Sequence, residues 1–116
     1  MEKEYGRIAS MDKAAIIERV RRYADAVRKD FDVKRVILFG SYSKDSPRED
    51  SDIDVAVVVD CVEGDFLAAE SKLFRLRRQI DSRIEPVLLE ASNDRSGFLE
   101  EILKTGEVIY SAEPAA

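Results

Sequence analysis

Hydrophobic residues recur with helical spacing in the first third of the chain. From Asp12 onward they return every three or four residues, which predicts an amphipathic helix with Ser10 or Asp12 as its N-cap. The apolar stripe consists of Ile16, Val20, Tyr23, Val27 and Phe31. Arginines and a lysine occupy the other positions, so we expect one face of this helix to pack on a core and the other to face water.

Two apolar runs rich in β-branched residues follow, and each predicts a buried strand. The first, VKRVILF at residues 33–39, stops at Gly40. A polar loop at residues 42–51, which contains Pro47, separates it from the second run, IDVAVVV at residues 53–59. The second run is apolar at almost every position, as expected for a strand that is covered on both faces.

The next segment predicts a second long helix, with Asp65 as a candidate N-cap behind Gly64. Its apolar stripe consists of Phe66, Ala69, Leu73, Leu76 and Ile80. The basic run RLRRQ at residues 75–79 is most simply the water-facing side of this helix.

The last third of the chain predicts one strand, one short helix and a final apolar segment. Residues 83–89 predict a strand, and Pro86 favours an edge position because proline has no N–H for the ladder. Residues 96–104 predict a helix that ends before Gly106. The apolar residues 108–110 form either a last strand or a segment packed on the core.

The order of these elements predicts an α/β or α+β fold, in which a small mixed β-sheet is flanked by helices. No repeat or linker divides the chain, so residues 1–116 are interpreted as a single domain with a core at about residues 12–110.

Composition narrows the functions that fit this fold. The formal net charge of −5 argues against non-specific binding to nucleic acid, which relies on excess lysine and arginine. The single cysteine, together with the lack of an apolar N-terminal segment or membrane span, predicts a cytoplasmic protein. The chain has no histidine, so catalysis would rest on carboxylates, hydroxyls and basic side chains.

Two carboxylates stand at the start of the most apolar strand. Strand alternation would send Asp52 and Asp54 to the same side, with Ile53 between them in the core. Adjacent carboxylates repel each other unless a cation relieves them, and Mg²⁺ prefers oxygen ligands. Gly40 and Ser41 offer a close backbone approach and donors for phosphate. Together these residues predict a metal and nucleoside triphosphate site.

The stretch GSYSKDSPREDSDID, residues 40–54, resembles the Gly-Ser, spacer and Asp-x-Asp signature of the DNA polymerase β-like nucleotidyltransferase superfamily. It is most similar to the short minimal nucleotidyltransferases that are often encoded beside a protein with a higher-eukaryote-and-prokaryote nucleotide-binding (HEPN) domain. The resemblance extends over residues 12–110. It implies a third metal-binding acid on the next strand, where Glu85 stands at the matching position.

The same resemblance implies roles for individual residues. Asp52, Asp54 and Glu85 would be catalytic and would hold two Mg²⁺ ions. Gly40 and Ser41 would bind the outer phosphates of ATP. Lys44 or Arg48, the basic residues of the spacer, would offset negative charge that develops during transfer. The spacer departs from the family pattern at Asp45, where glycine is usual.

The activity implied is transfer of AMP from ATP to a hydroxyl group of a partner protein, a HEPN-type toxin for which the chain would be the antitoxin. Two alternatives stay open: an antitoxin that acts by stoichiometric binding, and transfer to a small-molecule hydroxyl.

The candidate site residues also have simpler, purely structural interpretations. An Asp-x-Asp is commonly a solvated turn, and Lys44 and Arg48 can be plain loop charges. Homo-oligomerisation stays open as well.

Overall fold

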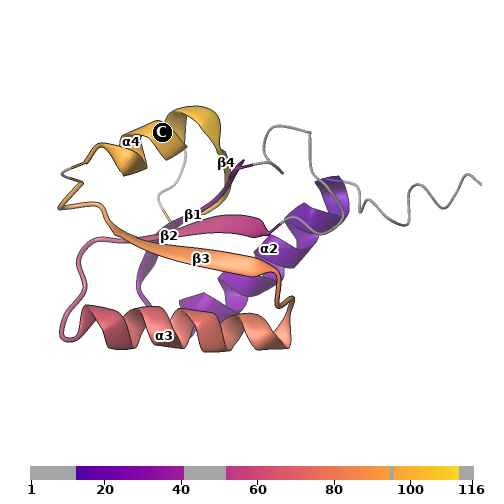
Figure 1. Ribbon diagram of the computed structural model, residues 1–116, viewed down its shortest axis with the longest axis horizontal. Coiled ribbons are helices and arrows are strands. Elements are labelled where there is room, and N and C mark those ends of the chain that lie inside the picture. Colours follow the sequence, from indigo (N-terminus) through magenta and orange to yellow (C-terminus); the bar gives the residue numbers. More distant parts are fainter. Residues whose placement is uncertain (1–12, 41–51, 95, 113–116) are drawn as a thin grey trace, which may run out of the picture.

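The protein forms a four-stranded mixed sheet with helices on both faces (Figure 1). The computed structural model describes residues 13–40, 52–94 and 96–112. The strands are β1 (Val33–Phe39), β2 (Ile53–Val59), β3 (Ile84–Glu90) and β4 (Glu107–Ser111), in the spatial order β3-β2-β1-β4. β1 runs antiparallel to β2 and β4, whereas β2 and β3 are parallel. The predicted α+β class with a small mixed sheet is therefore confirmed.

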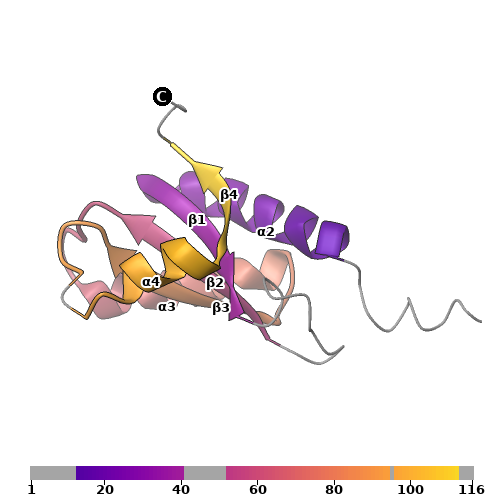
Figure 2. The same ribbon diagram turned by 90° about the horizontal axis from the view of Figure 1, so that it is seen from above.

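Helices α2 (Lys13–Arg28) and α3 (Phe66–Leu76) cover one face of the sheet, and α4 (Phe98–Thr105) covers part of the other. Figure 2 looks onto the face that carries α4 and shows α2 and α3 behind the strands. The connection between the parallel strands β2 and β3 runs through α3, as a parallel pair requires a crossover.

The N-terminal helix buries the predicted stripe. Ile16, Val20, Tyr23 and Val27 are fully buried in α2. The helix ends at Arg28, so Phe31 lies beyond it, where its N–H donates to the Val27 carbonyl at 2.9 Å. The prediction that Phe31 continues the helical stripe is wrong, although its ring still packs against the edge of this core.

Strand β2 is buried on both faces, which explains its unbroken apolar sequence. Ile53, Val55, Val57 and Val59 face the core under α2 and α3. Ala56 and Val58 face the smaller core under α4, together with Ile37 of β1 and two residues of α4, Leu99 and Ile102.

The second helix begins as expected, because the Asp65 carboxylate accepts hydrogen bonds from the backbone N–H groups of Leu67 and Ala68. It changes into a short 3₁₀ helix, η2 (Arg77–Gln79). The Tyr23 hydroxyl donates to the Leu73 carbonyl at 2.7 Å and so joins α2 to α3. Burial raises the pKa of Tyr23 well above its usual value, although the nearby charge of Arg77 lowers it somewhat.

The two edge strands of the sheet, β3 and β4, are consistent with the sequence predictions. β3, which contains Pro86, is an edge strand as predicted. Residues 108–110 belong to β4, so the apolar ending forms a strand at the opposite edge. Gly106 joins α4 to β4 at a crowded point, where an added Cβ would lie 2.8 Å from the Leu38 carbonyl oxygen.

Candidate active site

The two aspartates of the Asp-x-Asp pair occupy different positions relative to β2. Ile53 is the first residue of the strand and is fully buried, as expected. Asp54 is the second residue and is half-buried, on the face toward α4. Asp52 precedes the strand and is exposed. The rigidity of the strand therefore holds Asp54 directly and Asp52 only through its link to Ile53.

Glu85 stands beside Asp54 on the neighbouring strand. The parallel register of β2 and β3 makes these two residues Cα partners. Strand alternation sends both side chains to the same face, because Ile53 and Ile84 are buried together on the opposite one. The predicted third acid is thus next to the Asp-x-Asp pair, a position that depends entirely on strand register.

The backbone at Gly40 contacts the Asp54 carboxylate. Gly40 directly follows β1 and has a φ of 77°, a left-handed conformation that favours glycine. A Cβ at this position would overlap Oδ2 of Asp54 and lie 3.1 Å from its Cγ. Glycine is required here on two grounds, and Gly40 and Asp54 are close together at this point.

Asp54 is affected electrostatically by its two acidic neighbours. The pKa of Asp54 is raised, first by burial and then by the negative charges of Asp52 and Glu85. The ionised form of Asp54 therefore lacks full compensation from its described surroundings. A bound cation or the basic part of a ligand would provide this compensation.

Arg77 was missed by the sequence analysis. Its Nη1 lies 3.2 Å from Oε2 of Glu85 and donates a hydrogen bond to the Ile84 carbonyl oxygen at 2.8 Å. The prediction that residues 75–79 form a purely water-facing run is wrong for Arg77, whose side chain is only 25% exposed. The signal was present, because Arg77 lies four residues after Leu73 on the buried stripe of the helix.

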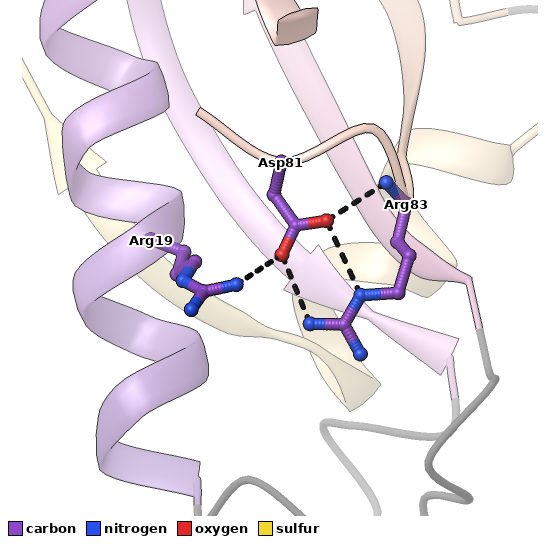
Figure 3. Close-up of polar contacts among 3 residues, drawn as sticks. All are labelled: Arg19, Asp81 and Arg83. Atoms are coloured by element: carbon purple, nitrogen blue, oxygen red, sulfur yellow. Dashed lines mark hydrogen bonds and ion pairs between the residues drawn. The ribbon is translucent and has the colours of Figure 1, made fainter. Parts of the chain in front are cut away.

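A partly buried ion cluster holds the start of β3 in place (Figure 3). The Asp81 carboxylate accepts hydrogen bonds from the Arg83 backbone N–H at 2.9 Å, from the Arg83 guanidinium and from Arg19 of α2. Burial alone would raise the pKa of Asp81, but these hydrogen bonds from Arg83 and Arg19 outweigh it and lower the pKa to about 2.

This cluster is connected to the site through the backbone. The Arg83 carbonyl accepts a hydrogen bond from the N–H of Ile53 at 2.9 Å, which fastens the turn before β3 to the start of β2. The expectation that Arg83 belongs to the strand is wrong: β3 begins at Ile84, and the Arg83 side chain folds back onto Asp81. The cluster supports the register in which Asp54 and Glu85 are partners.

Three predicted site residues, Ser41, Lys44 and Arg48, lie outside the described residues, as does Asp45. No helix among the described residues is long and apolar enough to span a membrane.

Comparison with known proteins agrees with this geometry. Residues 22–115 match the family described as "Polymerase beta, Nucleotidyltransferase". The chain belongs to this family. This nucleotidyltransferase also has the fold of a crystal structure from Sulfolobus solfataricus, of a protein whose assignment as a nucleotidyltransferase is itself provisional. The two share 17% identity with a TM-score of 0.68, over 92% of this chain and 90% of the other. No curated protein matches the chain.

Members of this nucleotidyltransferase family generally use nucleoside triphosphates and divalent metal ions. The donor chemistry of the site fits such an ion, because Asp52, Asp54 and Glu85 offer only carboxylate oxygens, and burial and the charges of Asp52 and Glu85 disfavour the ionised form of Asp54 unless a cation is present. The carboxylates are not yet gathered around one point: across residues 13–40, 52–94 and 96–112, no three acidic or cysteine side chains converge into a metal-binding group. Glu85 instead contacts Arg77.

Proposed function

We propose that this nucleotidyltransferase is Mg²⁺-dependent and transfers AMP from ATP to a hydroxyl group of a partner protein. The observation that carries the proposal is the pairing of Asp54 with Glu85 across β2 and β3, with Gly40 packed against Asp54. In this arrangement Asp54 and Glu85 are neighbours in the sheet, and Gly40, the start of the Gly-Ser segment, lies against Asp54. Metal-assisted transfer needs both of these parts, one for the ion and one for the phosphates.

In this proposal the site residues have separate roles in the transfer reaction. A divalent ion bound at these carboxylates would neutralise phosphate charge and lower the pKa of the acceptor hydroxyl. Asp52 and Asp54 would hold it, and Glu85 would complete the set. The acceptor oxygen attacks the α-phosphorus, the bond to the bridging oxygen of pyrophosphate breaks, and pyrophosphate leaves with the bonding electrons. A site carboxylate takes the hydroxyl proton.

We further propose that the acceptor belongs to a HEPN-type toxin and that the chain is its antitoxin. The support is the resemblance of residues 40–54 to minimal nucleotidyltransferases that are encoded beside such proteins. In the same proposal, Ser41 and the Gly40 backbone bind the outer phosphates of ATP, and Lys44 or Arg48 offsets developing charge. The protein acts in the cytoplasm.

The test uses ATP labelled at the α-phosphate, Mg²⁺ and the purified product of the neighbouring gene. We expect label on the partner with the wild-type chain and none with an Asp52→Asn, Asp54→Asn double variant. Asp60→Asn is the matched control, because Asp60 is exposed and follows the other end of the same strand. It should retain labelling.

Two outcomes would contradict this assignment in different ways. If wild type and double variant both suppress the toxin without labelling it, the chain acts by stoichiometric binding. If label appears only on small molecules of a cell extract, the acceptor is a small-molecule hydroxyl and the antitoxin assignment is wrong.

A further inference from the structure

Arg77 forms the closest described contact to the third acid of the site. Its Nη1 is shared between the Glu85 carboxylate, at 3.2 Å, and the Ile84 carbonyl, at 2.8 Å. The Phe74 ring lies under the guanidinium, with 4.9 Å between Cζ and the ring centroid. The guanidinium is therefore held from two sides besides its contact with Glu85, and it offers that carboxylate a positioned partner.

The same carboxylate has a second potential position. Glu85 is the Cα partner of Asp54, and its charge contributes to the raised pKa of that residue. Its side chain is 41% exposed, so it has room to change rotamer. Glu85 can thus pair with Arg77 or turn to a cation shared with Asp54.

These two positions compete. A guanidinium 3.2 Å from a carboxylate oxygen neutralises the charge that would attract a divalent ion, and its own positive charge repels that ion. An ion that takes Glu85 as a ligand must either displace the carboxylate from Arg77 or bind beside a positive charge. Both routes weaken metal binding relative to a site without Arg77.

We propose that Arg77 is a positioning residue that holds Glu85 away from the metal site and releases it when the ion binds, and so sets the metal affinity of the site. The inference rests on the proposed function, because it assumes that Glu85 is a metal ligand. It adds a residue outside the Gly-Ser and Asp-x-Asp segments.

The test measures Mn²⁺ binding to the full chain by isothermal titration calorimetry at about 0.15 M salt, where distant surface charges are largely screened. Replacing the arginine in Arg77→Met should tighten Mn²⁺ binding about 2- to 5-fold, the range expected for loss of one partly exposed ion pair. Arg78→Met is the matched control: Arg78 is the exposed neighbour on the same 3₁₀ helix, and its loss should leave the affinity unchanged.

A double-mutant cycle shows whether the effect passes through Glu85. Glu85→Gln alone should weaken Mn²⁺ binding. In that background Arg77→Met should give a smaller gain than in wild type, because only the direct repulsion between the guanidinium and the ion is then relieved. If Arg77→Met fails to fold, Phe74→Leu tests the same effect of Arg77 on Mn²⁺ affinity. It removes the ring under the guanidinium and should tighten binding in the same direction by a smaller factor.

The possible results distinguish failure of the Arg77 inference from failure of the proposed metal-dependent function on which it rests. If Asp54→Asn and Glu85→Gln weaken Mn²⁺ binding but Arg77→Met leaves it unchanged or weakens it, the inference is wrong and the metal site stands. An equal gain in Arg78→Met, or a gain that is undiminished in the Glu85→Gln background, also overturns it. If Mn²⁺ binding does not depend on Asp54 or Glu85, both proposals fail.

Discussion

Asp54 and Glu85 are Cα partners on the parallel strands β2 and β3, 31 positions apart in sequence but adjacent in the sheet. Between them the chain passes through α3, η2 and the turn fastened by Asp81. The two acids are therefore neighbours because α3 returns the chain to the same end of the sheet, and because the turn before β3 bonds to the start of β2. The position of the site follows from the crossover.

Replacing Asp54 with asparagine should lower activity but raise stability. Because burial and neighbouring charges raise the pKa of Asp54, its ionised form destabilises the folded state above that pKa. Asp54→Asn removes the charge, so we expect a higher melting temperature at pH 7 but at least about 100-fold slower nucleotidyl transfer, as for loss of a metal ligand. Differential scanning fluorimetry and the labelling assay measure the two effects. A variant that is less stable at pH 7 would contradict the electrostatic account.

Gly40→Ala should be more destabilising than its φ angle alone explains. The left-handed backbone costs about 1 kcal/mol for a residue with a Cβ, and the overlap with the Asp54 carboxylate adds to that cost. Gly64→Ala is a matched control, because Gly64 also has a positive φ, of 95°, but has no atom within 4 Å of an added Cβ. Urea unfolding should show the larger loss for Gly40→Ala, which should also lose transferase activity. Equal losses would mean that Asp54 moves aside freely.

The Asp81 cluster should make the free energy of unfolding decrease as the pH falls. A carboxylate with a folded-state pKa of about 2 stabilises the protein above its unfolded pKa of about 3.9, and the contribution disappears as pH falls toward 2. The difference between these two pKa values corresponds to about 2 to 3 kcal/mol, and the Asp81 side chain is only 7% exposed, so solvent screens it little.

The measurement is the free energy of unfolding by urea from pH 6 down to pH 2 for wild type and Asp81→Asn. The difference between the two proteins should shrink as pH falls, because protonation removes from wild type the charge that the variant lacks. A difference that is independent of pH would show that Asp81 acts through packing alone.

Tyr23→Phe tests the link between the two helices on the larger core. The hydroxyl is fully buried, and its bond to the Leu73 carbonyl is the described polar contact between α2 and α3 in this region. Its loss leaves that carbonyl without the hydroxyl donor and should reduce the free energy of unfolding by about 1 kcal/mol, with transfer activity retained. Urea unfolding measures the change. A neutral or stabilising effect would show that packing of the ring alone supports this contact.

Much of the fold was predictable because local patterns and burial agree. The stripe of α2, the cap at Asp65 and the edge position implied by Pro86 all reflect short-range rules that the structure obeys. Two of the errors lie where an arginine side chain binds a carboxylate across the turn between η2 and β3. Arg83 folds onto Asp81 at the point where a strand was expected to begin, and Arg77 contacts Glu85 from a run that was interpreted as solvent-facing.

The sequence by itself determined which residue types are available for chemistry: carboxylates at 52, 54 and 85, a glycine at 40 and no histidine. It also determined the apolar runs that become strands, since alternation and β-branching are properties of neighbouring residues. Only the tertiary structure decided that Glu85 stands opposite Asp54, that Gly40 lies against the Asp54 carboxylate and that Arg77 holds Glu85. Strand register and the α3 crossover set these contacts, and both depend on how the whole core packs, which no local pattern of residues specifies.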